Sequence, residues 1–140
     1  NEDKNPRAEP PNLDRDRDIL KVLAFSYALL VREIIPPRTR LLVVHSPPGK
    51  RSIPEMAVFP WLVLHLDKEQ IRSLWRSTGG GFPQVYFDEP EIESSGGKAR
   101  QVFEVRMGPD DDERFEVTFG KKDDRWLVRS FVDSIPEESS

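Results

Sequence analysis

Residues Arg100–Val132 read RQVFEVRMGPDDDERFEVTFGKKDDRWLVRSFV, and this stretch decides the fold. Apolar and polar side chains alternate along three segments of it, which is typical of half-buried antiparallel strands. The apolar positions are Phe103, Val105 and Met107 in the first segment, Phe115, Val117 and Phe119 in the second, and Trp126 and Val128 in the third. The polar turns Gly108–Asp112 and Gly120–Asp124 separate the segments, so the stretch predicts a three-strand meander.

The segment Asp14–Ile35 predicts one long N-terminal helix. Its apolar side chains recur every three or four residues, and three aspartates stand in its first turns, where the helix dipole favours negative charge. Pro36 and Pro37 then end it, because proline lacks the amide proton that a helix needs. We therefore expect an α+β fold, in which this helix packs on a curved, mainly antiparallel sheet that ends in the meander.

The chain between the long helix and the meander predicts further strands. Thr39–Ser46 and Trp61–Leu66 are rich in apolar and β-branched residues, and Phe82–Phe87 is a shorter segment of the same kind. The prolines of Ser52–Pro60 predict an irregular segment or a short edge strand. The serines and glycines of Asp88–Lys98 predict an exposed loop.

A second, short helix is predicted near residues 67–77. Asp67 can cap its first turn, with Gln70 three residues later as in a capping box. Gly79 is free to adopt the left-handed conformation that ends a helix. The apolar face of this helix consists of Ile71, Leu74 and Trp75.

Length and composition indicate a single domain over residues 14–135, between a polar linker at 1–13 and a polar tail at 136–140. The chain has no cysteine, which excludes disulfides and thiolate metal sites, and a net charge of -4 argues against a nucleic-acid-binding protein while leaving room for a local basic patch. No apolar run approaches the roughly 20 residues of a membrane span.

The first residues suggest a cellular location. The chain given starts at Asn1 and continues with a polar, proline-containing segment of the kind found behind a removed signal or lipid-anchor segment. We therefore expect an exported bacterial protein, periplasmic, secreted or tethered to a membrane through the removed segment. A cytoplasmic protein is the alternative.

A leading amphipathic helix, later strands and a closing meander form a pattern over residues 14–132, with the local step DRWLV at Asp124–Val128. This pattern resembles the cystatin-like roll of the nuclear-transport-factor-like superfamily. The resemblance implies a cone-shaped domain whose sheet wraps the long helix. Members of the superfamily include enzymes, binding modules and oligomerisation domains, so the resemblance leaves the function open.

No complete catalytic, cofactor or metal motif is present. His45 and His65 stand at the ends of predicted strands without the spacing of a metal site, and we interpret them as ordinary strand-end residues. The segment Pro47–Ser52 departs from a phosphate-binding loop, and the acidic run Asp110–Glu113 lacks the frame of a calcium loop. We expect no catalytic residue, no metal and no cofactor. These expectations favour a binding protein over an enzyme.

Aromatic side chains gather around Gly79–Gly81, and they fit either a core or an interaction surface. The core is the more common role of large aromatic residues in a small domain. Two apolar residues of the last predicted strand point away from the core in the expected alternation and extend the candidate surface. The candidate interaction residues are Trp75, Phe82, Tyr86, Phe87, Leu127 and Phe131.

Three functional hypotheses follow. The first is a non-enzymatic binding or protein-interaction domain with an unknown protein partner or small ligand. The second is a small-molecule-binding or enzymatic cone-shaped domain, with a pocket between the long helix and the sheet. The residues of that pocket would be Tyr27, His45, His65 and Ser130. The third is a homodimer formed through the outer sheet face, where Val102, Leu127 and Phe131 would be exposed.

Overall fold

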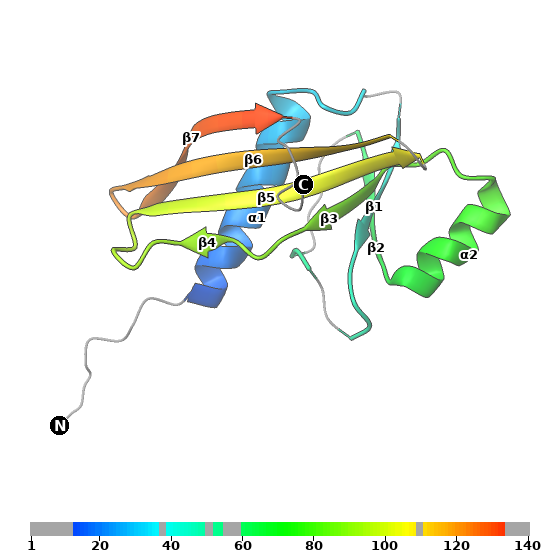
Figure 1. Cartoon of the computed structure of the whole chain (residues 1–140), viewed down its shortest axis with the longest axis horizontal. Helices are drawn as coiled ribbons and strands as arrows, with labels where there is room; N and C mark the ends of the chain where they lie inside the picture. Colours follow the sequence, from blue (N-terminus) through cyan, green and yellow to red (C-terminus); the bar gives the residue numbers. More distant parts are fainter. Residues whose placement is uncertain (1–12, 37–38, 50–51, 55–59, 109–110, 134–140) are drawn as a thin grey trace, which may run out of the picture.

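A computed structural model describes residues 13–36, 39–49, 52–54, 60–108 and 111–133. These residues form two helices and one seven-stranded sheet, which confirms the predicted α+β class (Figure 1). The elements in chain order are α1 (Leu13–Leu30), β1 (Leu41–His45), β2 (Leu62–Leu66), α2 (Lys68–Thr78), β3 (Gln84–Phe87), β4 (Glu91–Ile92), β5 (Lys98–Gly108), β6 (Asp111–Lys122) and β7 (Arg125–Asp133). The predicted linker at 1–13, apart from Leu13, and the predicted tail at 136–140 lie outside the described residues.

The sheet has the order β2-β1-β3-β5-β6-β7, with the short strand β4 paired to β5 beside this path. The strands β5, β6 and β7 form the predicted antiparallel meander, and β3 joins it antiparallel to β5. β1 runs parallel to both of its neighbours, β2 and β3. The sheet is therefore mainly antiparallel with a parallel end, and α2 connects β2 to β3 beside that end (Figure 1).

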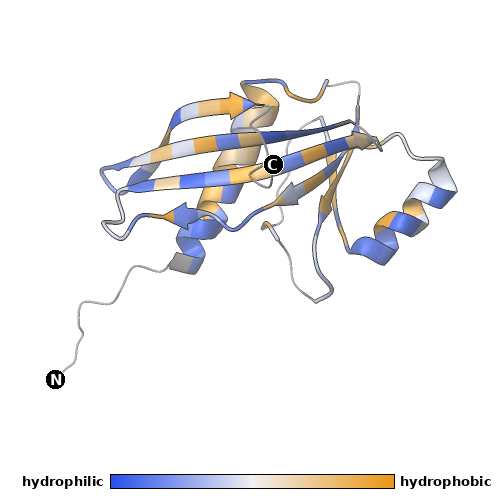
Figure 2. Ribbon diagram, viewed as in Figure 1, coloured by the Kyte–Doolittle hydropathy of each residue, from blue (hydrophilic) through white to orange (hydrophobic). Residues whose placement is uncertain are grey.

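The main core lies between α1 and one face of the sheet. Phe25 and Leu29 of α1 are fully buried, together with Phe103 of β5 and Val117 of β6. Figure 2 shows the alternation of hydrophobic and hydrophilic residues along β5 and β6 that the sequence predicts. The Phe25 and Phe103 rings meet edge-on with centroids 6.3 Å apart, whereas the Phe103 and Phe115 rings are stacked at 5.3 Å. A hollow of about 580 Å³ remains between α1 and the β6–β7 hairpin, lined by Ile19, Leu23 and Trp126 among others.

Helix α1 ends at Leu30, five residues before the predicted end at Ile35. The amide groups of Val31 and Arg32 both donate to the carbonyl oxygen of Tyr27, and Glu33 adopts a left-handed conformation with φ 51°. This turn redirects the chain so that Ile35 returns to the core, where it is almost fully buried. Ile34 is partly buried and Ile35 almost fully buried, although the chain is no longer helical at either residue.

Two irregularities change which face of the sheet some side chains occupy. Arg129 is an extra residue in β7, since Thr118 pairs with Ser130 while Phe119 pairs with Val128. Such a bulge reverses the alternation along the strand. A second register shift, between Arg106 and Gly108, leaves Met107 40% exposed instead of buried with Phe103 and Val105 as predicted.

The predicted turns and loops are shortened by longer strands. β6 continues to Lys122, so the turn before β7 consists of Asp123 and Asp124, which have φ angles of 53° and 62°. β6 begins at Asp111, inside the predicted first turn, of which residues 109–110 lie outside the described part. The predicted loop at 88–98 contains β4, which pairs with β5. Neither α1 nor α2 is long and apolar enough to cross a membrane, and only the described residues support that statement.

Candidate functional site

Helix α2 is fixed at both ends as the sequence predicts. The Asp67 carboxylate accepts a hydrogen bond from the Gln70 amide at 2.8 Å, and the Gln70 side chain accepts one from the Asp67 amide at 3.0 Å. Gly79 ends the helix in the left-handed conformation, with φ 78°, and its amide donates to the Trp75 carbonyl. Both ends of α2 are thus held by local hydrogen bonds, so the backbone of the helix has a defined start and end.

α2 packs on the sheet face opposite α1. Val43 of β1 points toward α2, whereas its neighbours Leu42 and Val44 belong to the core under α1. Val43 forms a second, smaller core with Ile71 of α2 and with Phe82. Figure 2 shows that most of α2 is hydrophilic, so only one side of this helix is used for packing.

A hollow of about 680 Å³ lies between α2 and the strands β3 and β5. Four basic side chains line it: Lys68, Arg72 and Arg76 from α2 and Arg106 from β5. The three from α2 are exposed and spaced four residues apart, which puts them on one face of the helix. The other lining residues are Ile71, Trp75, Gln84 and Tyr86. We call these eight residues the basic groove.

Among the residues that the structure describes, few acidic side chains neutralise the basic groove. The Arg106 guanidinium forms an ion pair with Glu104 at 3.0 Å, and this hydrogen bond raises the pKa of Arg106. Within the described part of the chain, no carboxylate forms an ion pair with Lys68, Arg72 or Arg76. The groove therefore carries an excess of positive charge in a protein whose net charge is -4.

On the sheet side of the basic groove, three side chains from neighbouring strands form a stack. Because β3 lies between β1 and β5, the Tyr86 ring has His45 on one side, at 5.0 Å between centroids, and Arg106 on the other, at 4.2 Å. The Tyr86 hydroxyl donates to Gln84 Oε1 at 2.8 Å. Burial raises the pKa of Tyr86, so the phenol keeps its proton and remains a donor at neutral pH. The Arg106 guanidinium is thus held by both Tyr86 and Glu104.

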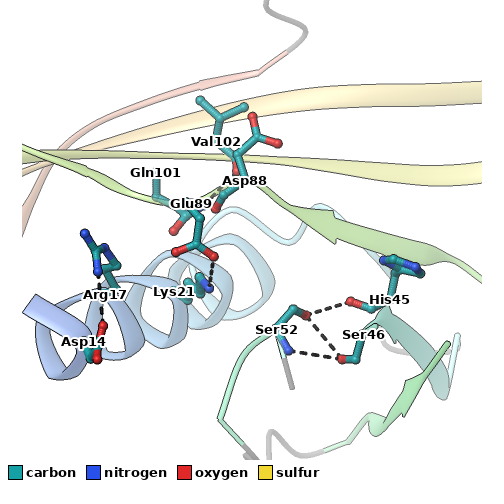
Figure 3. A network of polar contacts seen from close by, with 10 residues as sticks. All are labelled: Asp14, Arg17, Lys21, His45, Ser46, Ser52, Asp88, Glu89, Gln101 and Val102. Atoms are coloured by element: carbon teal, nitrogen blue, oxygen red, sulfur yellow. Dashed lines mark hydrogen bonds and ion pairs between the residues drawn. The ribbon is translucent and has the colours of Figure 1, made fainter. Parts of the chain in front are cut away.

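His45 stands beside the basic groove, and its surroundings disfavour its protonated form. Burial lowers its pKa below the ordinary value of 6.5, and the charges of Lys68 and Arg106 lower it further, while Asp67 acts in the opposite direction. The end of β1 is held by the Ser52 hydroxyl, which donates to the His45 carbonyl oxygen at 2.7 Å (Figure 3). His45 is therefore a neutral ring at neutral pH, stacked on Tyr86 and close to the cations Lys68 and Arg106.

Trp75 forms the apolar part of the basic groove. Its ring lies against Gly80, where an added Cβ would stand 2.7 Å from the indole. Phe82 meets the same ring edge-on, at 5.6 Å between centroids. The glycine cluster that follows α2 therefore has a packing role, because only a residue without a side chain fits against the indole.

The structure separates the four residues of the predicted pocket. Tyr27 packs against Phe131 at the edge of the core under α1, at 5.7 Å between ring centroids. His45 faces α2 on the other side of the sheet, and His65 lines a different hollow with Asp67 and residues 46–49. The Ser130 hydroxyl shares a hydrogen bond with Thr118. No common pocket is formed by these four side chains.

The predicted interaction residues divide into three groups. Trp75 and Tyr86 line the basic groove, with Phe82 buried beneath. Phe87 packs on Phe25 and Phe103 and belongs to the core. The remaining two residues come from β7 and are treated separately below, because the bulge at Arg129 changes their orientation.

The outer sheet face is less apolar than the homodimer hypothesis expects. Leu127 is exposed as predicted, at 42%. Phe131 instead points toward the core, since the bulge at Arg129 reverses the alternation, and it packs on Phe115. Val102 is also buried, at 5% exposure. The three residues therefore do not form one exposed apolar surface.

A second polar cluster lies at the edge of the main core. Lys21 of α1 is buried and donates to Glu89 at 3.1 Å, while the buried Gln101 side chain donates to the carbonyl oxygens of Asp88 and Val102 (Figure 3). These bonds fix the chain between β3 and β4 on α1. The Lys21 ammonium and the Gln101 amide nitrogen are bonded within the protein, while Gln101 Oε1 is buried without a hydrogen-bond partner among the described residues. The cluster therefore ties elements of the fold together.

Sequence reasoning identified Trp75 and Tyr86 but missed the cations of the basic groove. The spacing of Lys68, Arg72 and Arg76 was a visible signal, because residues four apart share a helix face. Arg106 had no such signal, since its position depends on the pairing of β3 with β5. The described residues contain no cluster of three or more histidine, aspartate or glutamate side chains able to hold a metal ion.

Comparisons with protein families, with curated proteins and with solved structures found no match to this chain.

Proposed function

We propose that the protein is a non-enzymatic binding module and that the basic groove holds the anionic group of its partner. The observation that carries the proposal is the convergence of Lys68, Arg72, Arg76 and Arg106 on one hollow, three of them without an ion pair among the described residues. Neighbouring unit charges 6 Å apart repel by about 0.7 kcal/mol even in water. An anion bound between them relieves that repulsion.

The defined backbone of α2 and the held position of Arg106 support binding by charge. α2 is capped at both ends, and Arg106 is held by Glu104 and Tyr86, so the rotations of the Arg106 side chain are already restricted when a ligand arrives. Guanidinium groups bind carboxylates and phosphates through two parallel hydrogen bonds, which makes the two arginines of α2 suitable for either anion. The shared chemistry of the partner is therefore a carboxylate or a phosphate.

Binding can be tested with pyrophosphate and with a short oligoglutamate, followed by ¹⁵N NMR. The chain has three tryptophans, and only Trp75 lines the basic groove, so its indole N–H signal reports on the site. We expect this signal to shift on addition of either anion. The double variant Arg72→Gln/Arg76→Gln should bind roughly tenfold more weakly, which corresponds to about 1.4 kcal/mol.

The matched control is the double variant Lys122→Gln/Arg125→Gln, which removes two exposed positive charges at the β6–β7 hairpin. It changes the net charge by the same amount but leaves the basic groove intact. Equal weakening by the two double variants, or shifts confined to residues outside the groove, would show that the anion is attracted only by overall charge.

A further inference from the structure

We infer that the partner enters the basic groove as an extended acidic peptide segment with carboxylates on alternate residues; this inference rests on the proposed function. The helix rises 1.5 Å per residue, so Lys68, Arg72 and Arg76 follow one another at steps of about 6 Å. In an extended peptide, alternate side chains point the same way about 6.6 Å apart. Three carboxylates at positions i, i+2 and i+4 thus match three cations.

The opposite wall of the basic groove suits the remaining side chains of such a peptide. Alternate residues of an extended chain point in opposite directions, so those between the carboxylates face β3 and β5. Gln84 and Tyr86 stand there, and Arg106 adds one cation on that side. A peptide can therefore use both walls of the basic groove.

A single-stranded nucleic acid fits the basic groove less well. Such chains bind through bases that stack on exposed aromatic faces. The Tyr86 ring is flanked by His45 and Arg106, and one face of the Trp75 ring is covered by Gly80. The Tyr86 ring thus holds Arg106 in place, and the two rings of the groove offer little surface for bases.

The experiment compares three ligands of similar charge by calorimetry, with the Trp75 indole signal as the reporter of the site. The first is a seven-residue peptide in which glutamate and threonine alternate, the second has the same composition with its four glutamates in a row, and the third is a thymidine oligonucleotide with four phosphates. We expect the alternating peptide to bind up to about fivefold more tightly than the peptide with consecutive glutamates, because it places three carboxylates on the α2 side instead of two. It should also bind more tightly than the oligonucleotide.

Each outcome has a distinct meaning. Equal binding of the two peptides at the Trp75 site would overturn the alternating geometry while leaving the groove an anion site. Tighter binding of the oligonucleotide at that site would make a nucleic acid the occupant. If none of the three ligands shifts the Trp75 signal, the inference and the proposed function both fail. The variant Arg76→Gln, which shortens the row of cations, should remove most of the advantage of the alternating peptide.

Discussion

His45 is the residue whose charge the fold controls most directly. Its ring stacks on Tyr86, and burial together with Lys68 and Arg106 lowers its pKa below 6.5, against the smaller opposite effect of Asp67. The unfolded chain, in which His45 has its ordinary pKa, therefore binds this proton more readily than the folded protein does. Protonation of His45 thus favours unfolding.

We predict that His45→Gln makes the protein less sensitive to acid. The free energy of unfolding of the wild-type protein should decrease as the pH falls below about 6.5. This decrease should level off once the pH is below the lowered pKa of His45 in the folded state. Glutamine has no such titration, while His65 and all carboxylates remain. Urea unfolding of both proteins at pH 7.5 and 5.0 measures the difference, and parallel losses in the two proteins would contradict it.

At the scale of elements, α2 depends on the glycine cluster that follows it. Gly80 and Gly81 both have positive φ angles, of 88° and 86°, but only Gly80 lies against the Trp75 ring. Replacing either residue with alanine imposes the backbone strain of a left-handed conformation, about 1 kcal/mol. At Gly80 the new methyl group also collides with the indole.

We predict that Gly80→Ala lowers the free energy of unfolding by roughly 2–3 kcal/mol and Gly81→Ala by only about 1 kcal/mol. Gly81→Ala is the matched control, because nothing lies within 4 Å of its Cβ position. Thermal unfolding of the two variants measures the difference between them. Equal midpoints would mean that the Trp75–Gly80 contact contributes nothing to stability.

The turn between β6 and β7 contains two residues whose replacement should stabilise the hairpin. Asp123 and Asp124 both have positive φ angles, as in a type I′ turn, for which asparagine followed by glycine is preferred. We predict that Asp123→Asn/Asp124→Gly raises the free energy of unfolding by about 1 kcal/mol, since glycine adopts this conformation without a steric cost. Chemical denaturation checks this, and an unchanged or lowered stability would contradict it.

The elements themselves were largely predictable, because their signals are local. The capping pair Asp67 and Gln70 and the final Gly79 defined α2, and the alternation of Phe115 and Val117 defined β6. Neither the left-handed turn at Glu33 nor the bulge at Arg129 has a sequence signal of its own. The bulge alone moves Phe131 from the predicted outer face to the core.

At the scale of the whole molecule, the strand order could not be predicted from local patterns. The parallel pairs of β1 with β2 and β3 join segments that only tertiary packing brings together. The basic groove depends on that order, because it places Tyr86 between His45 and Arg106. A helix face with three cations was visible in the sequence, but its opposite wall was not. The resemblance to the cystatin-like roll stays a prediction.

Positive charge is concentrated in one place on the molecule, because a protein with a net charge of -4 has four cationic side chains around one hollow. A charge-reversal experiment tests directly whether this separation serves binding. Arg72 and Arg76 are exposed on a capped helix and take no part in its core, so Arg72→Glu/Arg76→Glu should fold normally. Circular dichroism and the melting temperature verify folding before binding is measured.

The decisive measurement is the affinity of the wild-type protein and of Arg72→Glu/Arg76→Glu for two peptides, the alternating glutamate–threonine peptide and its lysine–threonine counterpart. We predict that the wild-type protein binds the glutamate peptide, and that the reversed protein loses this binding by roughly a hundredfold, since each reversal costs about 1.4 kcal/mol. The reversed protein should bind the lysine peptide more tightly than the wild-type protein does. Undiminished binding of the glutamate peptide by the reversed protein would contradict the assignment of the basic groove as the binding site.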